Sequence, residues 1–279
     1  VKTGVIYEQS AEADSGTTFS SNDQTNYAVY GVFGGENFTT GILFYMLDGK
    51  TQSSIPIAPE TSPWKNRQYL VDPYFTGTFG PVTVNAELQY RGGTWRDYYD
   101  PAIPDTDRDM LAYYAEGVFN FGAGSAELGY SHVPGDDPTT SDFEGQNYGD
   151  DWEKTWILVG STGSIAADLG GTGNFSDTGG NGDGLDLIYL GGTFNLSEKN
   201  SLGAIVALGK VDEPGAGVDD DAGIEVDVKW VSKLTENLKF TAVAAVLSAG
   251  DYWQQKAAIP TSDFDDLTYG FFGNLQLSF

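Results

Sequence analysis

The sequence has no cysteine, few basic residues and no long apolar run. Without cysteine, disulfide bonds and thiolate metal sites are excluded. Without a stretch of about 18 consecutive apolar residues, a helical membrane protein is excluded as well. Lysine and arginine number 14 against 40 aspartates and glutamates, which gives a formal net charge of -26. This charge repels phosphate backbones, so we expect no nucleic-acid partner and regard cations as the natural partners.

Histidine is almost absent too, because His132 is the single one in the chain. Any Ser-His-Asp triad or Asp-His pair would have to use it. It lies at the end of an expected strand, 125–133, and neither an Asp-x-His nor a His-x-Ser element surrounds it. We therefore expect no enzymatic activity and no cofactor, and we interpret His132 as a solvated residue at the rim of the fold.

What the sequence does have is a two-residue period, which is clearest in residues 265–279. Successive side chains of a strand point to opposite faces, so apolar and polar residues separate onto two faces. The same period recurs in 82–91, 111–121 and 224–233. In the last fifteen residues the polar face would carry Thr268, Gly270, Asn274, Gln276 and Ser278, and the apolar face Leu267, Tyr269, Phe271, Leu275, Leu277 and Phe279.

The connections between these segments alternate between short and long. Short connections are expected at 34–37, 80–81, 122–124, 197–200 and 235–237, and long ones at 10–24, 48–66, 92–107, 134–152, 212–221 and 252–264. Aromatic residues make up 14% of the chain and glycines number 37, which suits aromatic girdles and tight turns. Short turns at one end and long loops at the other are typical of a barrel built from hairpins that spans a membrane.

The sequence therefore predicts an all-β fold: a transmembrane, antiparallel up-and-down β-barrel that occupies 1–279 as a single domain. Thirteen segments are expected as strands, Lys154–Gly160 among them, and the weakly patterned, glycine-rich Gly163–Phe175 completes a count of about 14, with 12 as the alternative. Bacterial single-chain barrels of this kind have an even number of strands, short periplasmic turns and longer external loops. The expected location is the bacterial outer membrane, in contact with lipid and lipopolysaccharide.

The C-terminal third also resembles a known family. The strand Gly223-Ile224-Glu225-Val226-Asp227, the turn before Asn237-Leu238 and the later Gly250-Asp251 are similar to the C-terminal strands of alginate-export-type porins of Gram-negative bacteria. The terminal Phe279 resembles the C-terminal aromatic residue of many outer-membrane barrels. The resemblance implies an outer-membrane channel in which Glu225 and Asp227 line the lumen. The acidic composition favours cations over an anionic polymer as the solute.

The expected register also gives the residues that would line a pore. Acids outnumber bases among them, and charged linings select the ions that enter. We expect a porin-like channel for passive diffusion of small solutes, with a preference for cations. The pore-lining residues are Glu8, Asp72, Glu87, Arg91, Glu116, Glu127, Asp186, Glu225, Asp227 and Lys229.

An alternative is a structural or binding barrel whose lumen is plugged. Its acidic external loops would engage a surface partner or Ca²⁺, since carboxylate oxygens are the ligands that Ca²⁺ prefers. Such loops are also explained as hydrated segments that self-repulsion holds open. The acidic loop residues are Asp136, Asp137, Asp142, Glu144, Asp150, Asp151, Asp219, Asp220 and Asp221.

Overall fold

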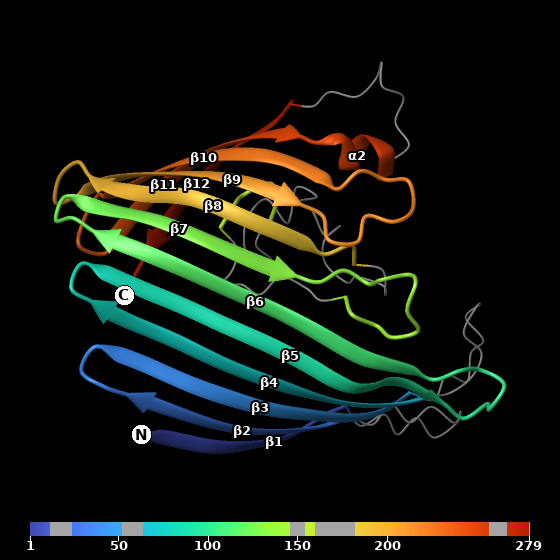
Figure 1. Ribbon diagram of the computed structural model, residues 1–279. Coiled ribbons are helices and arrows are strands. Elements are labelled where there is room, and N and C mark those ends of the chain that lie inside the picture. The colour runs from blue at the N-terminus through green and yellow to red at the C-terminus, as the bar shows by residue number, and fades with distance from the viewer. Residues whose placement is uncertain (12–23, 52–63, 146–153, 160–181, 257–266, 279) are drawn as a thin grey trace. The chain divides into compact units, whose positions relative to one another are not determined.

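The computed structural model describes residues 1–11, 24–51, 64–145, 154–159, 182–256 and 267–278. In these residues twelve strands form one sheet, and their order in the sheet is their order in the chain (Figure 1). The strands are β1 (Lys2–Ala11), β2 (Gln24–Gly34), β3 (Phe38–Thr51), β4 (Trp64–Phe79), β5 (Val82–Tyr98), β6 (Thr106–Asn120), β7 (Gly124–Val133), β8 (Leu185–Asn195), β9 (Asn200–Lys210), β10 (Asp221–Lys233), β11 (Leu238–Ala249) and β12 (Leu267–Leu277). The expected all-β, antiparallel up-and-down arrangement is confirmed.

The chain divides into two compact units. Unit 1 contains Val1–Thr76, Glu87–Ala112 and Asp137–Glu144, and unit 2 contains Gly77–Ala86, Tyr113–Asp136 and Gly145–Phe279. Strands β1 to β3 belong to unit 1, β7 to β12 belong to unit 2, and β4 to β6 contribute residues to both.

Hairpin turns connect the strands at the expected short connections. The turns after β4 and β6 contain Gly80 with φ 61° and Gly122 with φ 74°, a left-handed conformation that side chains other than glycine rarely adopt. These turns fix the register of their hairpins.

The expected strand Lys154–Gly160 is wrong for the residues that the structure describes, since 154–159 contain no strand. Strand β7 pairs directly with β8, from Gly124↔Phe194 to Val133↔Leu185, so no further strand lies between them. The backbone N–H groups of Trp156, Ile157 and Leu158 bond to side-chain carboxylates instead of a neighbouring strand. The other expected strand, Gly163–Phe175, lies within 160–181, outside the described residues. The described part of the sheet agrees with the alternative of 12 strands.

The two faces of unit 2 show the reverse of the usual polarity of a water-soluble protein. On β10 the exposed fractions of Ile224, Val226, Val228 and Trp230 are 46%, 42%, 41% and 41%, whereas Glu225 is 0% and Asp227 3% exposed. The register places Val206 of β9 and Val246 of β11 beside Val226, which extends the exposed apolar row. Charged side chains are almost never fully buried unless they are paired, so this polarity requires an explanation.

Unit 1 shows the same separation on β1 to β3. Its exposed row contains Val5, Tyr7, Val29, Ile42 and Phe44, which the register places side by side on one face. The buried Asn26 lies on the other face and donates a hydrogen bond to Glu8 at 3.3 Å. Each unit therefore has one apolar exposed face and one face that carries polar groups.

The helix in the described residues is α2 (Asp251–Lys256), of 6 residues. It follows β11 and lies against the start of β10, where Trp253 Nε1 donates to the carbonyl of Ala222 at 2.8 Å (Figure 1). Burial and the neighbouring Asp183 carboxylate raise the pKa of Tyr252, so its hydroxyl stays protonated and donates to Asp183 at 2.6 Å. Within the described residues, no helix has the length and hydropathy needed to cross a membrane.

The exposed row on β10 predicts a face-dependent response to an added charge. Val226→Arg should lower the free energy of unfolding in lipid vesicles by about 2 to 4 kcal/mol, because it places a charge on an apolar surface. Thr241→Arg adds the same charge to the opposite face of β11, where Thr241 pairs with Val231, and should cost less. If urea titrations show that both variants lose the same free energy of unfolding, this assignment of the faces is contradicted.

Candidate functional site

Two carboxylates on β10 hold the segment of residues 154–159 against the polar face of unit 2. Glu225 accepts hydrogen bonds from the backbone N–H groups of Trp156, Ile157 and Leu158 at 2.8, 2.6 and 2.6 Å. Asp227 accepts a further bond from Trp156 N–H at 3.1 Å. Hydrogen bonds to a carboxylate are stronger than bonds between neutral groups, so these bonds compensate the burial of Glu225 and part of the burial of Asp227.

Apolar contacts also hold segment 154–159 against the sheet. The side chain of Leu158 is fully buried and lies over Gly209 of β9, where an added Cβ would come within 3.3 Å of it. The ring of Trp156 stacks on that of Phe272 of β12, with centroids 5.2 Å apart. The Thr155 hydroxyl accepts a bond from Val159 N–H at 3.1 Å. Segment 154–159 is therefore both hydrogen-bonded and packed.

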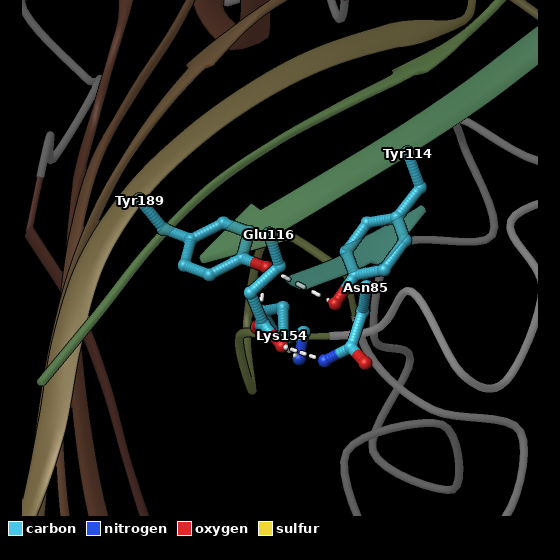
Figure 2. A network of polar contacts seen from close by, with 5 residues as sticks. All are labelled: Asn85, Tyr114, Glu116, Lys154 and Tyr189. Atoms are coloured by element: carbon cyan, nitrogen blue, oxygen red, sulfur yellow. Dashed lines mark hydrogen bonds and ion pairs between the residues drawn. The ribbon is translucent and has the colours of Figure 1, made fainter. Parts of the chain in front are cut away.

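A second cluster on this face surrounds Glu116 of β6 (Figure 2). Glu116 accepts bonds from Lys154 Nζ at 2.6 Å, Tyr189 Oη at 2.8 Å and Asn85 Nδ2 at 2.9 Å. The Lys154 ammonium also lies over the rings of Tyr114 and Tyr189, 5.5 and 5.6 Å from their centroids. The start of segment 154–159 is thus held by an ion pair between the buried Glu116 and the half-buried Lys154, and removal of the lysine would leave a buried carboxylate without its counter-charge.

Five of the expected pore-lining residues share this face of unit 2: Glu116, Glu127, Lys229, Glu225 and Asp227. Glu127 interacts electrostatically with Glu116, Lys154 and Lys229. The structure therefore brings these residues together, although it uses three of the acids to hold the segment.

Four expected residues lie in unit 1. Glu8 and Arg91 both interact electrostatically with Tyr45 of β3, which places them near each other. Asp72 and Glu87 interact with each other in the same way. The register places Glu8 on the face of the buried Asn26, and the lumen position of Asp72, Glu87 and Arg91 stays a prediction.

Asp186 lies on the opposite face from that expected. It pairs with His132 in register and shares a face with Ile188 and Leu190, both of which are exposed. Leu187 and Tyr189 occupy the polar face instead, where they are buried. Both faces of β8 carry apolar residues, so its sequence alone does not decide which residues lie on the polar face. Asp186 was therefore assigned to the wrong face.

Several residues of the polar faces were not anticipated. Lys154 and Tyr189 complete the Glu116 cluster, and in unit 1 the guanidinium of Arg108 lies 4.3 Å from the ring centroid of Phe143 and 5.2 Å from that of Trp95. Periodicity could have placed Arg108 and Tyr189 on a face. No local signal indicated that residues 154–159 would turn toward the sheet, because the contacts come from distant strands.

Comparison with known proteins gives structural matches of low similarity. No protein-family model matches the sequence, and no curated protein matches it, so the likeness to alginate-export-type porins stays a hypothesis. OmpT, an outer membrane protein of Vibrio cholerae, matches with 10% identity and a TM-score of 0.38, over 98% of this chain and 95% of that one. An anion-selective porin from Comamonas acidovorans matches with 10% identity and a TM-score of 0.33, over 89% and 90%.

The copper transporter OprC matches 92% of this chain with 11% identity and a TM-score of 0.36, and the chain spans 48% of that transporter's length. The chain is thus similar to outer-membrane β-barrel proteins over most of its length. With TM-scores below 0.5, nothing about its function is inferred from these matches.

The carboxylate contacts predict how segment 154–159 can be released. Glu225→Ala removes the acceptor of three backbone N–H groups, each of which costs about 1 to 3 kcal/mol when it stays buried without a partner. The segment should therefore detach, and cleavage by trypsin after Lys154 should accelerate by at least about tenfold, which corresponds to 1.4 kcal/mol. Mass spectrometry of the fragments measures this rate.

Glu87→Ala is the matched control, since it removes a carboxylate from unit 1 without touching the segment. Equal cleavage after Lys154 in the two variants would show that Glu225 does not hold the segment.

Proposed function

We propose that the protein is an outer-membrane β-barrel channel through which small solutes diffuse passively. The observation that carries this proposal is the reversed polarity of β10, on which carboxylates are buried and four large apolar side chains are exposed. Hydrocarbon chains of lipid would cover the exposed face, and a polar interior would surround the buried one. A contiguous exposed apolar surface in water would instead favour aggregation.

The lipid environment proposed for the exposed face also implies that the sheet closes on itself. Strands β1 and β12 are the two ends of the strand order. An open edge in lipid would leave backbone N–H and C=O groups without partners, each at a cost of several kcal/mol. We infer that β1 pairs with β12 to close a barrel of 12 strands, an even number as in bacterial barrels.

The proposed lumen is less acidic than the sequence suggested. Lys154 and Arg108 lie on the polar faces and offset part of the acidic charge there, and Asp186 is absent from them. The larger part of the net charge of -26 must then lie elsewhere, including the loops. We propose that loop and lumen acids together attract cations to the entrance, because a low-dielectric wall extends their field.

A plugged barrel is the second candidate, and one observation favours it. Segment 154–159 contacts β6, β8, β9, β10 and β12 on the face of the sheet that would line the proposed lumen. A segment held in this way narrows the space beside the polar face. Single-channel conductance distinguishes the candidates: a channel conducts in the unmodified state, whereas a plugged barrel conducts only when Glu225→Ala releases the segment.

We infer no covalent chemistry. Ser131, the neighbour of His132 in the chain, points to the opposite face of β7 and is fully buried. A nucleophile and its base have to lie within hydrogen-bond reach of each other, so this pair does not form a catalytic arrangement.

Ion selectivity tests the channel proposal. In planar bilayers under a salt gradient the protein should pass K⁺ in preference to Cl⁻, most clearly near 0.01 M salt, where the Debye length is about 30 Å. Glu87→Gln with Glu127→Gln removes two acids of the polar faces that do not bond to segment 154–159, and should shift the reversal potential toward zero. Asp219→Asn with Asp220→Asn removes the same charge from a loop.

A larger shift for the first pair would place the selective field in the lumen, and a larger shift for the second would place it at the entrance. Anion preference in the unmodified protein, or a potential that neither pair changes, would contradict the proposed cation preference.

A further inference from the structure

Three potential metal ligands converge at the end of the sheet from which long connections leave. One ligand atom each from His132, Asp186 and Asp212 lies within 4.8 Å of the other two. His132 Nδ1 and Asp186 Oδ1 are 2.8 Å apart, and the exposed fractions of their side chains are 18% and 29%. The cluster is therefore sheltered, yet open to a small ion from solvent.

Backbone contacts hold together the three chain segments that supply these ligands. His132 is near the end of β7, Asp186 is near the start of β8, and Asp212 follows β9. Asp136 N–H donates to the carbonyl of Gly182 at 2.9 Å, and Glu213 N–H donates to the carbonyl of Asp183 at 2.8 Å. The ligands are thus attached to a backbone framework that exists without any ion.

Neighbouring groups orient each ligand. The Tyr130 hydroxyl donates to Asp186 Oδ1 at 2.5 Å, and Gly135 N–H donates to Asp212 Oδ2 at 3.0 Å. The ring of Tyr113 stacks on the imidazole of His132, with centroids 4.9 Å apart. Such outer contacts fix the direction of metal ligands and typically change metal affinity by about 10- to 100-fold when removed.

We propose that His132, Asp186 and Asp212 bind a divalent transition-metal ion, for which Zn²⁺ is the best fit. An imidazole nitrogen with carboxylate oxygens is a donor set that Zn²⁺ accepts, at distances of about 2.0 to 2.2 Å, with a fourth position open to water. Ca²⁺ prefers six to eight oxygen ligands, so one imidazole and two carboxylates suit it poorly. The site differs from the acidic loops, because nitrogen ligation selects against the hard cations that those loops would attract.

Charge balance supports an ion at this position. Asp186 and Asp212 lie close together and repel each other, and the Lys210 ammonium, which is 2.9 Å from Asp220 Oδ2, offsets only part of the charge of Asp186. A divalent cation between the two carboxylates would relieve their repulsion. It would also join the ends of β7, β8 and β9, which gives the site a role in fixing this end of the sheet.

Calorimetric titration of the refolded full chain in detergent micelles with ZnCl₂ tests the proposal. We expect one Zn²⁺ per chain, and at least about tenfold weaker binding for His132→Ala and for Asp186→Asn with Asp212→Asn. Zn²⁺ should raise the thermal unfolding midpoint of the unmodified protein and leave that of the variants unchanged, because an ion that binds the folded state stabilises it.

The matched control is Glu198→Gln with Glu236→Gln, which removes two carboxylates from short turns and should bind Zn²⁺ as the unmodified protein does. If His132→Ala does not fold, Asp212→Asn alone carries the test, since Asp212 lies outside the strands. Failure of the unmodified protein to bind Zn²⁺, binding unchanged in the folded ligand variants, or displacement of Zn²⁺ by an equal concentration of Ca²⁺ would each overturn the site.

Discussion

Register between neighbouring antiparallel strands is the constraint on which the other contacts depend. Because Val226 pairs with Val206 and Val246, the row beside it contains Glu225, Ala207 and Leu247. A slip of one residue would move Glu225 and Asp227 to the exposed apolar face and bury Val226 with the polar groups. The hairpin turns prevent such a slip, and the separation of the two faces follows from the pairing that they set.

The buried acids of β10 are compensated by backbone groups from far along the chain. Glu225 pairs in register with Ala207 on β9, and the nearby Gly209 leaves space for Leu158 to approach the sheet. The backbone N–H groups of segment 154–159 then satisfy the carboxylate, and Lys154 neutralises Glu116. Burial of these two carboxylates therefore depends on segment 154–159, because the segment supplies hydrogen-bond donors to both. The position of the segment depends on the carboxylates in turn.

The two ends of the sheet differ in their chemistry. Short turns with glycines such as Gly80 and Gly122 close one end. At the other end longer connections supply Asp212 and Asp183, which accept hydrogen bonds from Gly135, just after β7, and from Tyr252 of α2. The charged residues at this end are held by specific contacts, so part of the acidity of the chain serves to organise structure as well as to repel or attract ions.

The sequence by itself predicted the twelve described strands and, for most of them, their two faces, but it also predicted a strand at Lys154–Gly160 that does not form in the described residues. On β10 and β12 large apolar residues alternate with polar ones, so Val226 and Phe271 could be assigned to the exposed face without a structure. On β8 both faces carry apolar residues, and only the pairing of Asp186 with His132 decided on which side Asp186 lies. Periodicity also gave no information on Lys154, whose partner Glu116 is 38 residues away in the chain.

The contacts of segment 154–159 and the meeting of His132, Asp186 and Asp212 were decided by the tertiary structure alone. A local pattern records which face of one strand is apolar, whereas these clusters need the register of several strands and the path of the connections between them.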